Sequence, residues 1–167
     1  MVESTCLTII GDRGESRIST ATYADLNRTI ERSIEAFTGQ VKDKWPLGSK
    51  FCTVFEGSDP YLNSSQALLA ALEIDGFVKE MDIRMGISTG EDAARQSELL
   101  AENAEGLEFR ILMSEIAYQH TGCSVEAFGN FVIRDRKKGL LENELYCVGI
   151  SLTKTFKPGE VPVYTHP

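Results

Sequence analysis

The order of apolar patterns along the chain limits its fold more than any other feature. Short strand-like runs alternate with amphipathic helical patterns, in which apolar residues recur every three or four positions. In chain order, we predict a strand at residues 6–10, a helix over 23–37, strands at 40–45 and 51–55, a helix over 63–77 and a strand at 82–88. Two right-handed crossovers in this βαββαβ order predict an antiparallel sheet with both helices on one face, which is the ferredoxin-like arrangement.

The remaining sequence adds elements to this core. It predicts a helix over residues 92–105, a strand at 109–113, a short helix at 114–119 and strands at 128–133 and 144–148. A chain of 167 residues fits one domain comfortably. We therefore expect a single α+β domain over residues 1–150, followed by a C-terminal tail at 151–167 that is irregular or docked on the surface.

Local sequence signals predict where the first helix ends, where the second begins and which residues of the strand at 82–88 share a face. Gly39 is expected to end the first helix, and Asn63 lies where the second one opens. In the strand at 82–88 the odd-numbered residues are apolar, so they should share one side of the sheet and alternate with Arg84 and Gly86.

Composition narrows the range of partners. A net charge of −8 argues against a nucleic-acid surface, which needs a basic stripe to neutralise phosphates. No stretch approaches the roughly 20 apolar residues of a membrane-spanning helix. The first residues lack the basic segment and apolar run of a secretory signal, so we expect a cytoplasmic protein with no membrane partner. The four cysteines fall singly, without the spacing of a zinc site or a disulfide framework.

Six segments match, in order, the motifs of one protein family. They are residues 7–16, 41–42, 48–55, 83–91, 111–115 and 137–148. The strongest match is Ile-Arg-Met-Gly-Ile-Ser-Thr-Gly-Glu at 83–91, which is close to the pattern L-R-V-R-I-G-I-H-T-G-E. From residue 5 to residue 150 the chain thus resembles the class III adenylate and guanylate cyclase homology domain, which implies that fold. A weaker likeness, through residues 10–17 and 49–51, is to the SatD-like bacterial proteins.

The resemblance implies roles for four residues. Asp12 matches the first metal-binding aspartate, and Arg95 matches an arginine that stabilises the transition state. Lys42 matches a position that reads the purine base, and Lys138 one that binds phosphate. Each residue also suits a structural role. An aspartate is common in turns, and the other three suit exposed positions on a helix or beside a strand.

Other residues that such a cyclase needs are absent. The family bridges two metal ions with two carboxylates, but the second position here is Ser49, and a hydroxyl cannot replace a bridging carboxylate. The asparagine that orients the ribose is replaced by Glu91, whose charge repels a triphosphate. The family's β-hairpin arm, which supplies dimer contacts and part of base recognition, is missing after Gly90.

Three functions fit these observations. The first, which we favour, is a non-catalytic cyclase-like signalling or interaction module. The second is a nucleotide cyclase, a phosphorus–oxygen lyase that acts on purine nucleoside triphosphates alone or as the serine-bearing half of a heterodimer. The third is a sensor domain for a nucleotide or another small molecule. The resemblance also implies a homodimer or a related cyclase-like partner chain, with a purine nucleotide as candidate ligand. Mg²⁺ or Mn²⁺ is expected only if the nucleotide site works.

Overall fold

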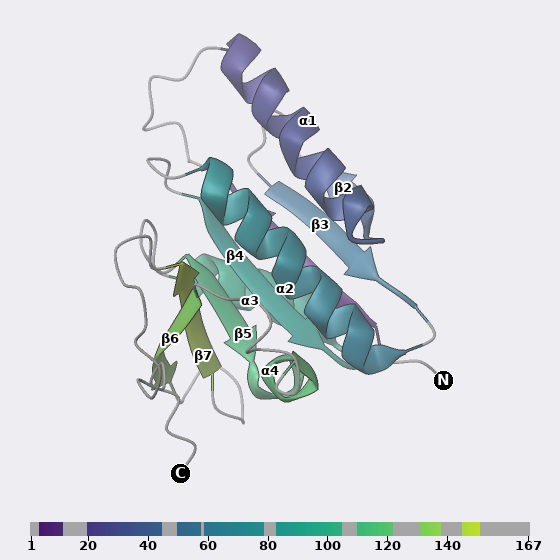
Figure 1. The fold of residues 1–167 in the computed structure, drawn as a ribbon, viewed down its shortest axis with the longest axis vertical. Coiled ribbons are helices and arrows are strands. Elements are labelled where there is room, and N and C mark those ends of the chain that lie inside the picture. Colours follow the sequence, from purple (N-terminus) through teal and green to yellow (C-terminus); the bar gives the residue numbers. More distant parts are fainter. Residues whose placement is uncertain are drawn as a thin grey trace.

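In the part of the chain that the structure describes, seven strands form one sheet with helices on both faces (Figure 1). The computed structural model describes residues 4–11, 20–44, 50–57, 59–78, 83–104, 110–121, 131–137 and 145–150. Its elements are β1 (Thr5–Ile10), α1 (Thr20–Ala36), β2 (Gln40–Lys44), β3 (Lys50–Phe55), α2 (Pro60–Phe77), β4 (Arg84–Thr89), α3 (Ala93–Asn103), β5 (Ile111–Ser114), α4 (Glu115–Thr121), β6 (Phe131–Lys137) and β7 (Leu145–Ile150). None of the described helices is long and apolar enough to span a bilayer.

The first four strands form the predicted ferredoxin-like core. β1 lies between β3 and β4 and is antiparallel to both, with Ile9 opposite Phe51 on one side and Met85 on the other. β2 pairs with the outer side of β3. The resulting order β2-β3-β1-β4 confirms the topology predicted from the sequence pattern. Beyond this core, β5 runs parallel to β4, and β7 and β6 continue the sheet in antiparallel pairing.

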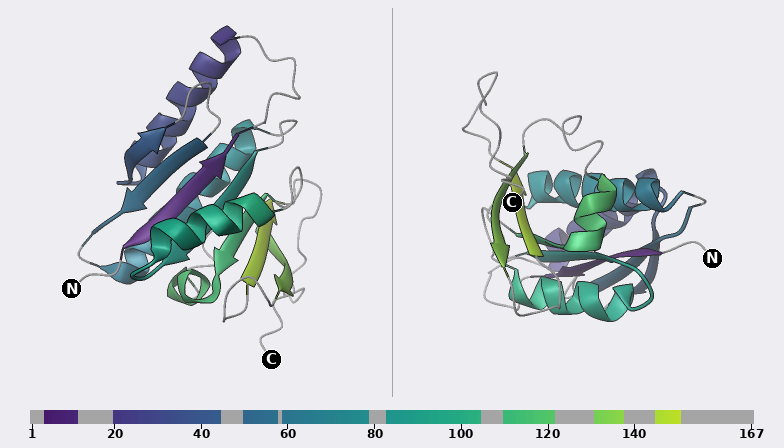
Figure 2. Two further views of the ribbon diagram at one scale, coloured as in Figure 1. Left: turned by 180° about the vertical axis from the view of Figure 1, so that it is seen from behind. Right: turned by 90° about the horizontal axis from the view of Figure 1, so that it is seen from below.

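The helices are divided unequally between the two faces of the sheet. Among the described helices, α1, α2 and α4 lie on one face, and α3 lies on the other, against β4 and β1 (Figure 2). The prediction that α1 and α2 share a face is therefore confirmed. The helix predicted at 92–105 is also confirmed, and its position on the opposite face is a new observation.

Alternation along the strands separates an apolar face from a polar one. The odd-numbered residues of β1, β4 and β5 belong to the main core under α1, α2 and α4: Leu7, Ile9, Met85, Ile87, Ile111 and Met113. The alternation predicted for the strand at 82–88 is confirmed, with Ile83 just before the strand proper. Even-numbered positions such as Thr8 and Ser88 are also buried, because α3 covers the second face.

Gly86 permits the close approach of α3 to the sheet. A Cβ added to Gly86 would lie 2.5 Å from the backbone nitrogen of Ala101 and 2.8 Å from the Cβ of Leu100, and closer still to the carbonyl oxygen of Ser97. Two of these three atoms belong to the backbone of α3. The helix can therefore rest on β4 at this distance only because residue 86 has no side chain.

One predicted helix boundary needs correction. Asn63 does not open α2. The helix begins three residues earlier at Pro60, because Asp59 caps it by accepting hydrogen bonds from the backbone N–H groups of Tyr61 at 3.0 Å and Leu62 at 3.5 Å. The first helix ends before Gly39, as predicted.

The structural role of Gly39 differs from the usual one at a helix end. The residue with positive φ is Thr38, at 68°, and not the glycine. A Cβ on Gly39 would instead come within 2.6 Å of the Phe55 ring and 2.7 Å of Ile34. Residue 39, between α1 and β2, must therefore be glycine because the side chains of Phe55 and Ile34 leave no room for a Cβ.

Candidate functional site

The two candidate metal-binding residues lie next to paired strand ends: one follows the end of β1, and the other precedes the start of β3. Ile10, the last residue of β1, is the cross-strand partner of Lys50, the first residue of β3. Asp12 follows Ile10 by two residues, and Ser49 immediately precedes Lys50. Both Asp12 and Ser49 lie outside the described residues, as does Lys138. The pairing of Ile10 with Lys50 shows that the strand ends next to Asp12 and Ser49 lie side by side. The metal-binding roles of Asp12 and Ser49 stay predictions.

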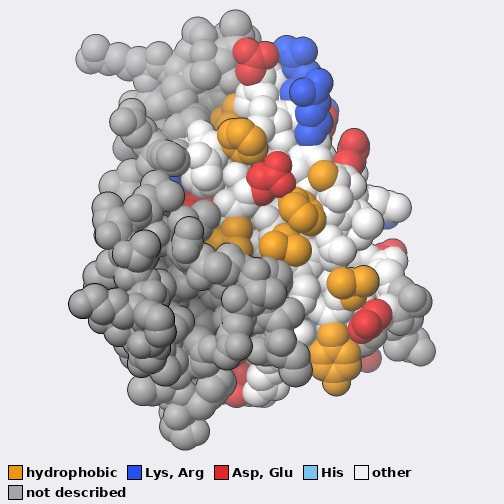
Figure 3. Space-filling model, in the orientation of Figure 1, with side chains coloured by type: hydrophobic (Ala, Val, Ile, Leu, Met, Phe, Trp, Pro, Cys, Tyr) orange, Lys and Arg blue, Asp and Glu red, His pale blue; other side chains and the backbone are white. Residues whose placement is uncertain are grey.

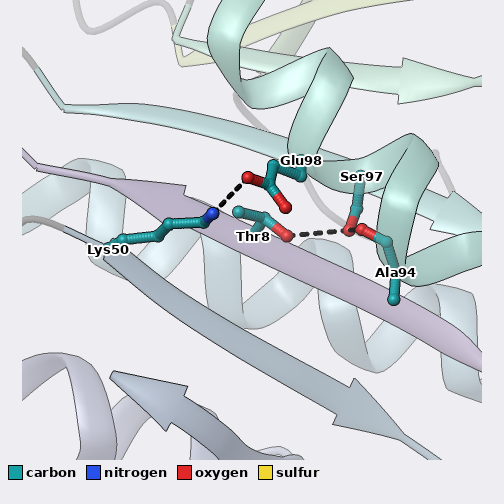
Figure 4. Close-up of polar contacts among 5 residues, drawn as sticks. All are labelled: Thr8, Lys50, Ala94, Ser97 and Glu98. Carbon is teal, nitrogen blue, oxygen red and sulfur yellow. Dashed lines mark hydrogen bonds and ion pairs between the residues drawn. The ribbon is translucent and has the colours of Figure 1, made fainter. Parts of the chain in front are cut away.

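An ion pair joins this end of β3 to α3. The ammonium group of Lys50 contacts the carboxylate of Glu98, and both side chains are partly buried (Figure 4). Lys50 belongs to the motif segment at 48–55, but neither it nor Glu98 was predicted as a site residue. No local sequence signal could have found this pair, because its partners are 48 positions apart.

Hydroxyl groups attach α3 to the sheet beside this ion pair. Thr8 Oγ1 and Ser97 Oγ are 2.8 Å apart, and the Ser97 hydroxyl also donates to the carbonyl oxygen of Ala94 at 3.0 Å (Figure 4). Further along, the Ser88 hydroxyl donates to Gln96 Oε1 at 2.8 Å. These contacts, together with Gly86, place α3 in one position over β1 and β4.

The connection from β4 to α3 contains only three residues, Gly90, Glu91 and Asp92. Gly90 has φ +126°, a conformation that favours glycine, and its N–H donates to the carbonyl oxygen of Ser4 at 3.1 Å. Glu91 is exposed. Because all three residues are described, the predicted absence of a hairpin arm between β4 and α3 is confirmed directly.

Arg95 lies on the solvent side of α3. Its Nε donates to Asp92 Oδ2 at 2.6 Å, and its side chain is 68% exposed. The hydrogen bond from this guanidinium to Asp92 raises the pKa of Arg95, so the charged form is favoured. Within its own chain, the arginine expected to stabilise a transition state is held by a neighbouring carboxylate.

Lys42 lies far along the sheet from the β4–α3 connection. It occupies β2, an edge strand, at the register shift between Val41 and Asp43, and it is exposed. β3 separates β2 from β1, and α3 packs mainly on β1 and β4. The structure therefore does not bring Lys42 and Arg95 of one chain into a common cleft.

Two half-buried thiols lie on the same sheet face as Lys50. Burial raises the pKa of Cys6 to about 11, and the neighbouring Cys52 and Glu56 contribute in the same direction. Burial also raises the pKa of Cys52, while Lys50 opposes this shift and Glu98 adds to it. Both cysteines are free, and they lie on β1 and β3. Their raised pKa values make them poor nucleophiles near neutral pH.

The described residues do not fit a divalent metal centre. Among them, no three side chains of histidine, cysteine, aspartate or glutamate converge closely enough to hold an ion. The ammonium groups of Lys44 and Lys50 flank the β2–β3 connection, and Lys50 pairs with Glu98. The two positions expected to bind metal, Asp12 and Ser49, lie outside the described residues, so the loss of the two-metal pair stays a prediction from the sequence.

Comparison with known proteins identifies the fold. No protein-family profile and no curated protein matches the sequence. Solved structures do match. A dimeric guanylyl cyclase domain of the RhoGC fusion protein from the aquatic fungus Blastocladiella emersonii has a TM-score of 0.69 and 17% identity, covering 90% of this chain and 98% of that one. The adenylyl cyclase CyaB from P. aeruginosa has a TM-score of 0.69 and 14% identity, with coverage of 92% and 97%.

A third similar structure is the guanylate cyclase domain of RhGC from Catenaria anguillulae in complex with GTP. Its TM-score is 0.66 at 15% identity, with 89% of this chain and 96% of that chain covered. The chain therefore has the fold of class III nucleotide cyclase domains, as its motifs implied. At these identities the likeness establishes the fold alone.

Proposed function

We propose that the chain is a non-catalytic module with a cyclase fold, which acts by contacting a protein partner or by sensing a ligand. The observation that supports this proposal most strongly is the direct passage from β4 into α3. Three residues cannot form the hairpin arm, and in the sequence Glu91 matches the position of the family's ribose-orienting asparagine. Positioning of a substrate can lower the activation barrier by about 7–11 kcal/mol. Loss of the groups that position the ribose is therefore a sufficient reason for inactivity.

The local charges support the same conclusion. Glu91 and Asp92 both lie at the start of α3, and Asp92 already binds Arg95. A triphosphate approaching this connection meets two carboxylates and an arginine that must first leave its partner. The net charge of −8 adds a general repulsion. A sensor or interaction role does not need transition-state chemistry and is compatible with these groups.

A product assay tests the proposal. Purified protein is incubated with Mn²⁺ and each purine nucleoside triphosphate, and cyclic nucleotides are measured by mass spectrometry. We expect no product from the wild type, from Asp12→Ala or from Ser49→Asp. Turnover by the wild type that Asp12→Ala abolishes would overturn the proposal. Turnover by Ser49→Asp alone would show that Glu91 and the missing arm matter less than their chemistry suggests.

A second candidate function is the serine-bearing half of a heterodimeric cyclase. The exposure of Arg95 favours it, because a guanidinium on the solvent side of α3 is available to a partner chain. Mixing the protein with an aspartate-bearing cyclase-like chain should then give turnover that Arg95→Ala removes. Arg28→Ala is the matched control, since Arg28 forms the same kind of exposed pair with Asp25, also three residues away. Equal activity of both variants would eliminate this candidate.

A further inference from the structure

The outer surface of α2 is unusually apolar for an exposed helix face. Phe77 and Leu62 are 59% and 52% exposed, and Leu69 is partly exposed. At about 100° per residue, these three side chains and Glu73 lie within about 80° of arc, so they form one stripe along the helix. Figure 3 shows hydrophobic side chains gathered along this surface. Such a stripe is typical of a face that another segment covers.

The end of β7 lies close to one end of this stripe. Val148 of β7 pairs with Ile111 of β5, so Ile150 lies one step beyond the level of Arg110. The guanidinium of Arg110 bonds to the carboxylate of Asp75, two residues before the end of α2. α2 also contacts β7 directly. Ile150, the last described residue of β7, therefore lies on the side of the C-terminal end of α2.

The sequence after Ile150 complements the stripe in both spacing and charge. Residues 151–157, Ser-Leu-Thr-Lys-Thr-Phe-Lys, lie outside the described residues. In an extended chain Leu152 and Phe156 share a side, about 13 Å apart, with Lys154 between them. Along α2, Phe77 and Leu69 are about 12 Å apart, with Glu73 midway between them.

We propose that residues 151–157 run back along the outer face of α2 and cover its apolar stripe. In this arrangement Leu152 packs on Phe77, Phe156 packs on Leu69, and Lys154 pairs with Glu73. α2 carries two acidic residues and no basic one, whereas residues 151–157 carry two lysines and no acid. The occupant is thus a segment of the same chain, and the contact does not depend on any nucleotide-related function.

Photo-crosslinking tests this contact in the full-length protein. p-Benzoylphenylalanine replaces Phe77, the purified protein is irradiated, and joined peptides are identified by mass spectrometry. We expect crosslinks from position 77 to residues 151–157 at the mass of a monomer. The same photoreactive residue at Glu35, which is exposed near the end of α1, should give no crosslink to this segment. Crosslinks that join two copies of the chain, or none to 151–157, would overturn the proposal.

Charge reversal adds a test of the register. In the protein with p-benzoylphenylalanine at position 77, Lys154→Glu should lower the yield of the crosslink to residues 151–157 several-fold, because it places the new carboxylate beside that of Glu73. Combining Lys154→Glu with Glu73→Lys should restore the yield, whereas Lys157→Glu alone should change it little. Circular dichroism checks that each variant is folded. Failure of the double reversal to restore the yield in folded protein would show that Lys154 does not face Glu73.

Discussion

Substitution of Gly86 by alanine tests whether α3 is seated on the sheet as the structure shows. The added Cβ would approach the backbone nitrogen of Ala101 to 2.5 Å, whereas carbon contacts are optimal near about 3.5–4.0 Å. Backbone atoms of a packed helix cannot move aside individually, so α3 must retreat as a unit by about 1 Å. A gap of this size forfeits roughly a quarter to a half of the dispersion energy between the facing surfaces.

The cost can be estimated from the contacts that a retreat weakens. Overpacking of a core position costs about 1–3 kcal/mol. The Thr8–Ser97 and Ser88–Gln96 hydrogen bonds, both 2.8 Å long, would also lengthen, at about 1 kcal/mol each. We therefore expect Gly86→Ala to lower the free energy of unfolding by about 3–5 kcal/mol. In a protein of this size such a loss corresponds to roughly 6–20 °C in melting temperature.

Urea unfolding followed by circular dichroism measures this difference. Gly76→Ala is the matched control, because an added Cβ at Gly76, within α2, meets no atom within 4 Å. Alanine is favoured over glycine inside a helix by about 1 kcal/mol, so this control should be slightly stabilising. A Gly86→Ala protein within about 0.5 kcal/mol of the wild type would refute the inferred seating of α3.

Three further predictions concern charge, thiol chemistry and assembly. Asp75→Asn should destabilise the protein by about 3–5 kcal/mol in urea unfolding, because it leaves the buried guanidinium of Arg110 without its carboxylate. Asp25→Asn, in an exposed pair, should cost less than about 1 kcal/mol. Since its pKa is raised to about 11, Cys6 should react slowly with iodoacetamide at pH 8, and peptide mapping should show labelling rising toward pH 11. Light scattering at micromolar concentration should show a monomer or a weak dimer, because the arm that widens a cyclase dimer interface is absent.

Each of the last predictions has a result that would count against it. Equal destabilisation by Asp75→Asn and Asp25→Asn would mean that the buried pair adds nothing beyond an exposed one. Rapid labelling of Cys6 at pH 8 in folded protein would show that burial does not protect its thiol. A tight dimer in which each Asp12 faces the partner's arginine would contradict the non-catalytic proposal.

The topology was predictable because the relevant signals are local. Alternation in residues 83–88 and the three-to-four-residue period of the helices specify their elements without reference to distant residues. The connection lengths and the handedness of crossovers then leave few arrangements of the sheet. The apolar pattern predicts a start of α2 that is three residues too late, because the helix begins at Pro60 after the polar cap Asp59, and neither residue belongs to the apolar repeat.

The contacts of α3 could not be predicted in the same way. Lys50 and Glu98 are separated by 48 positions, and Thr8 and Ser97 by 89. The local sequence around one residue of each pair therefore does not indicate its partner. The placement of α3 on the opposite face follows from the polar even-numbered side of β1 and β4, where Gly86 leaves room for it. This role of Gly86, leaving room for α3, can be recognised only when the pairing of β1 with β4 is known.

A structure determined after soaking with a purine nucleoside triphosphate and Mn²⁺ tests the central claim most directly. The non-catalytic proposal predicts no pair of manganese ions at the ends of β1 and β3, and it predicts that Arg95 still binds Asp92. Two manganese ions held at Asp12, bound to a triphosphate whose α-phosphate is contacted by Arg95 of either chain, would contradict it.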